Sequence, residues 1–366
     1  MVTVGIVGAA GQYGQWLSQF FREQMQCAVR GHDPRQPDSD LPETLLEGCD
    51  VLLFAAPIRH TVSIIGEYVR RAGARTREQL WLDVTSIKAA PVEAMLQSQA
   101  EVVGLHPMCA APKTPSLRGQ VLVVCEARLH RWRDWLRQLL HAFGAEVVRA
   151  TPEHHDQVMA LVQGLVHAGH LAQARVLAAQ PAPLSGLDAL LPFRSPQFAL
   201  DSAMITRILN GNPAIYEDIQ YGNPHVAPVL ESLAREVQAM LEQVKRGTDA
   251  ARGQWREQSI STPRATLGKE ACVAGNYRYE QLAYLLADLN EANAITVFLP
   301  RDKPGSLRAL LAVFADAGIN LLSLHSSRNP AGEVHFRLGL DRPISDASVQ
   351  DAVRVLEQSG IGRRIG

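Results

Sequence analysis

Short apolar runs alternate with amphipathic stretches over the first 150 residues, and this alternation limits the choice of fold more than any other feature. Runs such as Val4–Val7 and Val51–Ala55 lack polar residues, which is typical of strands buried on both faces of a parallel sheet. Strands that alternate with helices predict a doubly wound α/β domain over residues 1–150. The further predicted strands are Cys27–Val29, Leu80–Leu82, Val102–Leu105, Val121–Val124 and Val147–Val148, and the predicted helices are Tyr13–Glu23, His60–Arg71 and Arg131–Phe143.

The pattern becomes helical after Thr151-Pro152 and stays so to about residue 289. Glu153–Ala179, Pro196–Leu209 and Val226–Val244 are the clearest helical segments. Their apolar faces exceed what one small helical layer can bury. We therefore expect an all-α domain over residues 151–289 that also forms the interface of a homodimer.

Composition excludes several classes of function. Lys and Arg number 36 and Asp and Glu 37, for a net charge of −1, so no basic surface for nucleic acid or anionic lipid is expected. No apolar run reaches the roughly 18 residues that span a membrane. The five cysteines include no Cys-x-x-Cys pair, which disfavours disulfides and metal sites. No basic segment precedes the first strand, so we expect no signal peptide and a cytoplasmic protein.

The first predicted strand ends in a glycine-rich turn, Gly8-x-x-Gly11-x-x-Gly14, and a helix follows. Glycines let backbone N–H groups approach a pyrophosphate at a helix N-terminus. The position after the first strand of a βαβ unit favours a nucleotide site over an ordinary turn. We expect these glycines, with Gln12 and Tyr13 between them, to bind the cofactor of a Rossmann-type domain.

Asp33 follows the second predicted strand, nineteen residues after Gly14. An acid at this place accepts hydrogen bonds from the adenosine ribose and disfavours a 2′-phosphate, which predicts NAD. Arg30 and Arg35 leave NADP open, because an arginine accommodates that phosphate. The alternative for Asp33 is a turn residue before Pro34.

Two polar segments follow predicted strands at their carboxyl ends, where open α/β sheets bind ligands. They are Asp83-Val-Thr-Ser86-Ile-Lys88 and Gly104-Leu-His106-Pro-Met108. His106 either accepts the proton of a substrate hydroxyl while hydride leaves the same carbon, or caps the loop before Pro107. In the first case Ser86 hydrogen-bonds the imidazole and fixes its tautomer.

The helical region contributes further polar candidates. His154-His155-Asp156 begins a long helix, in which His155 either faces a ligand or caps the helix, whereas His154 is expected in solvent. Gln163 and His167 lie four residues apart on one helix face. Arg207 lies between apolar residues and either pairs with an internal acid or binds a carboxylate ligand through its fork of donors.

Together these motifs resemble the prephenate dehydrogenase family of tyrosine biosynthesis, over residues 1 to about 288. The resemblance implies NAD-dependent oxidative decarboxylation of prephenate to 4-hydroxyphenylpyruvate. The matching segments are Gly8-x-x-Gly11-x-x-Gly14, Asp83-x-x-Ser86-x-Lys88, Gly104-Leu-His106-Pro-Met108, His155-Asp156 with Gln163 and His167, and Ala203-Met-Ile-Thr-Arg207.

The resemblance also implies roles for single residues. His106 matches the catalytic histidine that hydrogen-bonds the ring hydroxyl, and Ser86 matches the serine that assists it. His167 matches a histidine that lines the substrate pocket, and Arg207 matches the arginine that binds a substrate carboxylate. Gln163 stands where some members have serine and is included among the substrate-binding residues.

The last 75 or so residues alternate again, in the order β-α-β-β-α, which predicts a small ferredoxin-like module over residues 290–366. The predicted strands are Ala294–Leu299, Leu321–Ser326 and Glu333–Leu340, with a turn at 329–332 and a last helix at Ser345–Gln358. A helix opened by Pro304-Gly305 precedes Gly318, the expected C-cap. Ile295–Pro300, Lys303–Leu307 and Ala317–Asn320 resemble an ACT domain. That resemblance implies tyrosine or phenylalanine as an effector; the alternative is a packing module without a ligand.

Several alternatives stay open. Arogenate dehydrogenase or a dual-specificity cyclohexadienyl dehydrogenase shares every motif, and the loop Cys109–Lys113, with Ala110 where the family often has glycine, leaves the substrate choice undecided. A β-hydroxyacid dehydrogenase or imine reductase is disfavoured by the histidine segment and the ACT-like tail. A sensor of NAD and amino acids without turnover is disfavoured because His106 and Arg207 are both present. No chorismate mutase domain is expected before the first strand.

Overall fold

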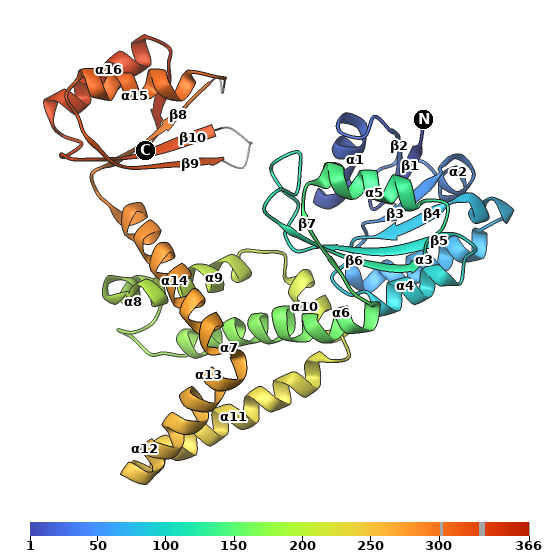
Figure 1. Cartoon of the computed structure of the whole chain (residues 1–366), viewed down its shortest axis with the longest axis horizontal. Coiled ribbons are helices and arrows are strands. Elements are labelled where there is room, and N and C mark those ends of the chain that lie inside the picture. Colours follow the sequence, from blue (N-terminus) through green and yellow to red (C-terminus); the bar gives the residue numbers. More distant parts are fainter. Residues whose placement is uncertain (301–302, 329–333, 366) are drawn as a thin grey trace. The chain divides into compact units, whose positions relative to one another are not determined.

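The computed structural model describes residues 1–300, 303–328 and 334–365. The chain forms two compact units, one of residues 1–190 and 201–251 and the other of residues 191–200 and 252–366 (Figure 1). The helical region expected over residues 151–289 is thereby shared between the two units. Within the described ranges, no helix combines the length and the apolar composition that crossing a bilayer requires.

Among the described residues of the first unit, seven strands form one sheet in the order β2-β1-β3-β4-β5-β6-β7. The first five run parallel, whereas β6 lies antiparallel to β5, and β7 is parallel to β6. All seven predicted strands are present. The expectation of a parallel sheet is wrong for β6 and β7, which both run opposite to the first five strands. The reason is that a loop without a helix returns the chain beside β5. The strands are β1 (Thr3–Val7), β2 (Ala28–His32), β3 (Val51–Phe54), β4 (Leu80–Asp83), β5 (Glu101–Pro107), β6 (Val121–Arg128) and β7 (Glu146–Arg149).

Helices cover both faces of this sheet, as expected for a doubly wound fold. Helices α1 and α5 pack on one face and α2, α3 and α4 on the other (Figure 1). Strands β3, β4 and β5 are buried on both faces, which explains their continuous apolar runs. The helices are α1 (Gln12–Glu23), α2 (Pro42–Gly48), α3 (Ile58–Arg71), α4 (Ala89–Leu96) and α5 (Arg133–Phe143), with a 3₁₀ turn at Ala74–Glu78.

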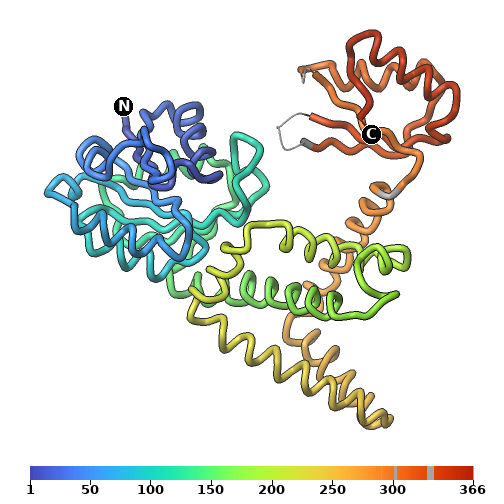
Figure 2. The backbone as a smooth tube through the Cα atoms, turned by 180° about the vertical axis from the view of Figure 1, so that it is seen from behind, coloured from blue at the N-terminus to red at the C-terminus, as the bar shows by residue number. Residues whose placement is uncertain are grey.

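After the sheet, the chain enters a helical stretch that starts at Pro152 (green in Figure 2). Thr151 caps it, because its Oγ1 accepts a hydrogen bond from the His154 N–H. A π-helical turn, Ala160–Leu165, separates α6 (Pro152–Met159) from α7 (Val166–Ala178). The later helices are α8 (Leu187–Leu190), α9 (Pro196–Leu209), α10 (Pro213–Gly222), α11 (Val226–Arg246), α12 (Asp249–Arg256), α13 (Thr262–Leu267) and α14 (Lys269–Asn290), with a 3₁₀ turn at Leu191–Phe193 and a π turn at Glu257–Ser261.

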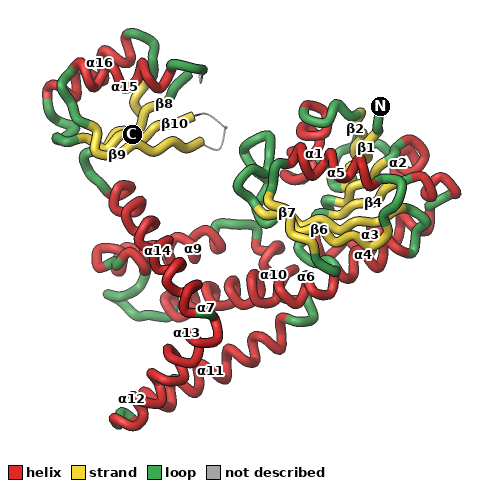
Figure 3. Tube along the Cα trace, viewed as in Figure 1, coloured by secondary structure: helices red, strands yellow, loops and turns green. Residues whose placement is uncertain are grey.

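The C-terminal part folds in the order β-α-β-β-α, as the sequence predicts, and one further short strand, β11, follows. Its described strands form an antiparallel sheet in the order β11-β8-β10-β9, with two helices on it (Figure 3). Gly318 adopts a φ of +67° just after α15, so the predicted C-cap is confirmed. The predicted turn at 329–332 lies outside the described residues. The elements are β8 (Ala294–Phe298), α15 (Ser306–Asp316), β9 (Leu321–Arg328), β10 (Val334–Leu340), α16 (Ala347–Gln358) and β11 (Arg363–Ile365).

Side chains of this sheet hold the end of α14. The Arg337 guanidinium on β10 donates hydrogen bonds to the carbonyl oxygens of Asp288, Leu289 and Glu291, at 3.2, 3.1 and 2.8 Å. His325 Nε2 on β9 lies 3.0 Å from the Asp288 carboxylate. A cation at the C-terminal carbonyls of a helix satisfies acceptors that the helix leaves unpaired.

Candidate active site

The glycine-rich turn between β1 and α1 has no room for a side chain at Gly8 or Gly14. Gly8 has a φ of +90°, and a Cβ on Gly14 would lie 2.2 Å from the Gly8 carbonyl oxygen. Helix α1 starts at Gln12 with Gly11 as its N-cap, so no side chain covers its first N–H groups, and its first turn holds no acid. This end of α1 therefore offers backbone donors and the positive end of the helix dipole to an anion.

Asp33 follows β2, as predicted, and only 2% of it is exposed. Its carboxylate accepts hydrogen bonds at 3.0 Å from the Ala10 N–H and from the Arg35 backbone N–H, Nε and Nη2. The Arg35 hydrogen bonds lower the pKa of Asp33 to about 2 against the opposing effect of burial. At this end of the sheet, a hollow of about 710 Å³ is lined by Ala9, Gly31 and Arg35, among others, and not by Asp33 itself.

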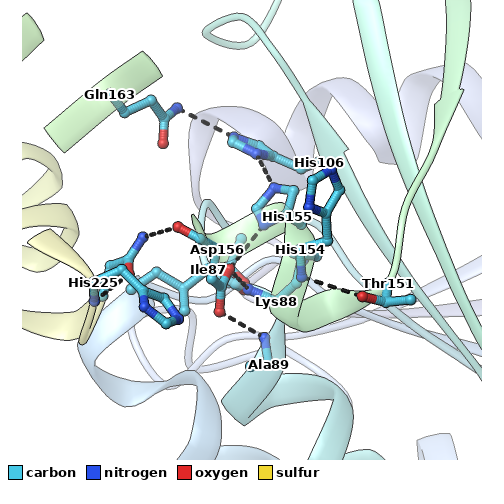
Figure 4. Close-up of polar contacts among 12 residues, drawn as sticks. Ile87, Lys88, Ala89, His106, Thr151, His154, His155, Asp156, Gln163 and His225 are labelled. Atoms are coloured by element: carbon cyan, nitrogen blue, oxygen red, sulfur yellow. Dashed lines mark hydrogen bonds and ion pairs between the residues drawn. The ribbon is translucent and has the colours of Figure 1, made fainter. Parts of the chain in front are cut away.

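His106 lies on β5, and only 3% of it is exposed. Its Nδ1 lies 2.8 Å from Nε2 of His155, and Nδ1 of His155 lies 2.8 Å from the Asp156 carboxylate (Figure 4). The Lys88 and Ala89 N–H groups, at the start of α4, donate to the same carboxylate at 2.8 and 2.9 Å. The structure thus joins the loop after β4, the end of β5 and the first turn of α6.

A buried ion pair fixes the loop after β4. The Lys88 ammonium donates hydrogen bonds to the Asp83 carboxylate and, at 2.8 Å, to the Leu105 carbonyl oxygen. Thr85 Oγ1 donates to the same Asp83 carboxylate at 2.6 Å. Because Leu105 precedes His106 on β5, this ion pair contacts the strand that carries the imidazole.

Burial decides the charge of this cluster. Desolvation, together with His155 and Lys88, holds the pKa of His106 well below its ordinary value. Desolvation also lowers the pKa of His155, although the hydrogen bond to Asp156 opposes it. Burial would raise the pKa of Asp156, but hydrogen bonds from His155, Ala89 and Lys88 lower it. Near neutral pH the cluster therefore holds one carboxylate and two uncharged imidazoles.

Gln163 lies in the π-helical turn and faces His106. Its Nε2 lies 3.4 Å from Nε2 of His106 (Figure 4), and its buried Oε1 has no hydrogen-bond partner within the described part of the chain. The neighbouring Gly164 carbonyl oxygen accepts a hydrogen bond from Gln220 on α10 at 2.8 Å. π turns release backbone groups and recur at functional sites.

His167 and Arg207 come from α7 and α9. The His167 ring packs edge-on against Tyr216 at 5.0 Å between centroids, and its buried Nδ1 has no hydrogen-bond partner in the described ranges. Burial, followed by the nearby Arg207 guanidinium, lowers the pKa of His167. Arg207 itself is exposed, and the structure gives it no ion pair with any described acid. Of its two predicted roles, pairing with an internal acid is therefore not seen.

Ser86 does not take the place that the sequence suggests. It is half-buried, and across the described residues no hydrogen bond joins it to His106, whose two ring nitrogens face His155 and Gln163 instead. The sequence leaves the role of His155 open and does not connect Asp156 to His106. The only available signal is the His-Asp pair at a helix start.

The loop after β5 is tied to α1. The Tyr13 hydroxyl donates to the Cys109 carbonyl oxygen at 3.0 Å, and Trp16 Nε1 donates to the Thr114 carbonyl oxygen at 2.8 Å. Burial and the contact with Cys109 raise the pKa of Tyr13. The loop that departs from the family pattern thus lies beside the glycine-rich turn.

Three family models match consecutive parts of the chain. Residues 35–149 match the nucleotide-binding domain of prephenate dehydrogenase, and residues 151–254 match its dimerization domain. Residues 294–357 match the ACT domain.

Known proteins show the same likeness. The chain is 29% identical over 262 residues to a probable arogenate/prephenate dehydrogenase of Methanocaldococcus jannaschii, covering 67% of this chain and 57% of that protein. It is 31% identical over 220 residues to the T-protein of Enterobacter agglomerans, covering 59% and 55%. The chain therefore spans somewhat more than half the length of these curated relatives.

A solved structure shares the fold. It is prephenate dehydrogenase from Aquifex aeolicus in complex with hydroxyphenyl propionate and NAD⁺, with a TM-score of 0.57 and 19% identity over 72% of this chain and 98% of that one.

Two models of one family together cover residues 35–254 except residue 150. The chain therefore belongs to the prephenate dehydrogenase family and carries an ACT domain at its C-terminal end.

Proposed function

We propose that this protein is an NAD-dependent prephenate dehydrogenase, which converts prephenate to 4-hydroxyphenylpyruvate and carbon dioxide. One observation carries the proposal: a buried, uncharged His106 has its Nδ1 held by His155 and its Nε2 turned toward Gln163. An uncharged imidazole with one ring nitrogen held is suited to accept a hydroxyl proton at the other nitrogen.

The glycine-rich turn and Asp33 fit a dinucleotide. The uncapped N-terminus of α1 suits a pyrophosphate, and the close approach of Gly14 to Gly8 lets the chain turn beneath it. An ionised Asp33 suits the adenosine ribose of NAD, provided that Arg35 gives up part of its contact with the carboxylate. In the same position Arg35 could meet the 2′-phosphate of NADP, which makes the cofactor preference a point to measure.

The chain's own residues would move one proton. NAD, when bound, supplies the acceptor for the hydride of the hydroxyl-bearing ring carbon. His106 Nε2 accepts the proton of the ring hydroxyl. As the ring carboxylate leaves as carbon dioxide and the ring becomes aromatic, His106 returns this proton to the ring oxygen. Ser86, half-buried on the neighbouring loop, is proposed to assist at the hydroxyl.

The substrate's carboxylates need a cation within the helical part of the site. We assign this role to Arg207, which is exposed and lies near His167. His167 and Gln163 would line the same pocket, because each has a buried polar atom without a protein partner among the described residues. A buried polar atom is ordinarily hydrogen-bonded, so a ligand or water is expected there.

Arogenate is the second candidate substrate. It differs from prephenate in the side chain, where an amino group replaces the keto group, and it keeps the ring hydroxyl that His106 would contact. The name of the Methanocaldococcus jannaschii relative includes both substrates. For the whole protein we propose a homodimer in the cytoplasm whose ACT domain binds tyrosine or phenylalanine and regulates turnover.

The first experiment follows NADH absorbance with prephenate and NAD, beside arogenate and NADP, each with and without tyrosine or phenylalanine. We expect turnover with prephenate and NAD. In a parallel assay, His106→Asn should lower kcat by about 10²- to 10⁴-fold and still bind NAD. Turnover with arogenate alone would change the proposed substrate from prephenate to arogenate and leave the proposed role of His106 unchanged. No turnover with either substrate, or a His106→Asn variant with normal kcat, would reject the proposal.

A further inference from the structure

The buried hydrogen bonds that end at His106 have a direction that their chemistry dictates. Asp156 is 1% exposed, and its carboxylate accepts from the N–H groups of Lys88 and Ala89. An ionised carboxylate has no proton to donate. His155 Nδ1, 2.8 Å from this carboxylate, must therefore carry a proton and donate it.

The next bond follows from the first. An uncharged imidazole carries one proton, so with Nδ1 protonated, Nε2 of His155 has only a lone pair. This atom lies 2.8 Å from Nδ1 of His106, which must then be the donor. The reverse arrangement would place a bare His155 Nδ1 against the carboxylate, with two acceptors facing each other.

The contact at the other side of His106 agrees with this direction. An amide nitrogen can only donate, and Gln163 Nε2 lies 3.4 Å from Nε2 of His106. The bond from His106 Nδ1 to His155 therefore leaves Nε2 of His106 as an acceptor, and the Gln163 amide nitrogen is a matching donor in its present orientation. His106 Nε2 is also the atom that would take the substrate hydroxyl's proton.

We infer that Asp156 and His155 are positioning residues that hold His106 in the tautomer with a protonated Nδ1 and a free Nε2. This inference rests on the proposed function and assigns to a His-Asp pair the task that the sequence suggests for Ser86. Asp156 is well placed for it, because its carboxylate also caps α4 and its backbone carbonyl oxygen accepts from Asn223 at 2.7 Å. The ring of His155 therefore cannot turn without breaking buried hydrogen bonds.

The test compares variants of two neighbouring histidines in the full-length protein. His155→Leu removes the acceptor for His106 Nδ1 and leaves both backbone bonds to Asp156 in place. His155→Gln keeps an amide that can accept from His106 in one of its two orientations. His154→Gln is the matched control, because His154 is exposed and its side chain is not part of the cluster.

Two readouts separate positioning from mere stability. The first is the kcat and KM for prephenate: we expect kcat to fall about 10²-fold in His155→Leu, less in His155→Gln and not in His154→Gln, with KM little changed. The second is nitrogen NMR of ¹⁵N-histidine-labelled protein, in which the His106 signals are identified by their absence in His106→Asn. We expect a protonated Nδ1 and a bare Nε2 in the unliganded protein, and a mixture of tautomers in His155→Leu and Asp156→Asn.

The outcomes distinguish this inference from the proposed function. A protonated Nε2 on His106 in the unaltered protein would overturn the inference, as would a normal kcat in His155→Leu. Absence of turnover with both prephenate and arogenate in the unaltered protein would reject the proposed function, while the NMR result would still decide the tautomer. If Asp156→Asn does not fold, the His155 variants decide, because they keep the cap of α4.

Discussion

At the scale of single residues, the site depends on how burial sets charge. His106, His155 and Asp156 are each no more than 3% exposed, so a group among them ionises only where hydrogen bonds offset the loss of water. The Asp156 carboxylate accepts three such hydrogen bonds and is ionised. The two imidazoles have too few hydrogen bonds to offset their burial, so they remain uncharged. The activity should therefore depend on pH and on the guanidinium near His167.

The dependence on pH comes from His106. Burial, then His155 on α6 and Lys88 before α4, lower the pKa of His106 below its ordinary value of about 6.5. Because the uncharged imidazole is the active form, kcat/KM for prephenate should stay level from neutral pH to below that value. It should then fall as the pH drops through the lowered pKa. A fall centred at or above the ordinary histidine pKa, in protein shown by circular dichroism to be folded, would contradict this.

The cation is Arg207. A fork of charged hydrogen bonds to a carboxylate contributes about 1.5–3 kcal/mol and exists in the ground state, so its loss should raise the KM for prephenate about 10- to 100-fold. We expect Arg207→Ala to do so with kcat changed only a few-fold. Arg207→Lys should lie between, because lysine keeps the charge without the fork. An unchanged KM in Arg207→Ala would remove this residue from substrate binding.

At the scale of elements, the π-helical turn decides which residues reach His106. Gln163 follows His155 by eight positions, and in a regular α-helix the two side chains would point about 80° apart. A π turn winds less per residue and reduces this angle, which is how both side chains come to face one imidazole. Gln220 ties α10 to the turn, because its Nε2 donates a hydrogen bond to the Gly164 carbonyl oxygen.

Two glycines of this helical stretch should respond oppositely to alanine. A Cβ on Gly164 would lie 2.6 Å from Cγ2 of Val226, which is 1% exposed, so Gly164→Ala should lower the free energy of unfolding by about 1–3 kcal/mol. A Cβ on Gly169 of α7 would have nothing within 4 Å, so Gly169→Ala should raise it by about 0.5–1 kcal/mol. Urea unfolding of both variants measures this. A stabilised Gly164→Ala would show that α11 does not pack closely on the turn.

Elements are easier to predict from this sequence than the contacts between them. Helix α9 matches its predicted bounds, and all seven predicted strands are present. The runs of β3, β4 and β5 are easy to recognise because these strands are buried on both faces. The π turn is not predicted, since residues 160–165 carry the same apolar pattern as a regular helix. The direction of β6 is not predicted because apolar runs do not encode strand direction. The pairing of His106 with His155 spans 49 residues, and no local pattern indicates it.

At the scale of the whole molecule, α11 carries an apolar stripe that one chain leaves in solvent. Val237, Met240, Leu241 and Val244 are 56%, 39%, 43% and 69% exposed and recur at helical spacing. Residues 151–254 match a dimerization domain, so we expect a second copy of the chain to cover this stripe. Leu241→Glu should then raise the dimer dissociation constant tenfold or more, about 1.4 kcal/mol, in analytical ultracentrifugation.

A matched control keeps this test specific. Ser232→Glu adds the same charge to α11 nine residues earlier, about half a turn away from Leu241, where it should leave the dissociation constant unchanged. Equal weakening by both variants would point to charge repulsion instead of a buried stripe. A dimer unaffected by Leu241→Glu would place the interface elsewhere.

The contact of Arg337 with the last carbonyl oxygens of α14 has a mechanical consequence. Only residues 291–293 separate that helix from β8, and His325 holds the helix from a second strand. The ACT domain is therefore joined to the helix before it without slack that could absorb a displacement. A ligand that bends or separates the strands of this sheet would therefore rotate α14 with them. Binding at the ACT domain would then reach the rest of the chain as a rotation of this helix.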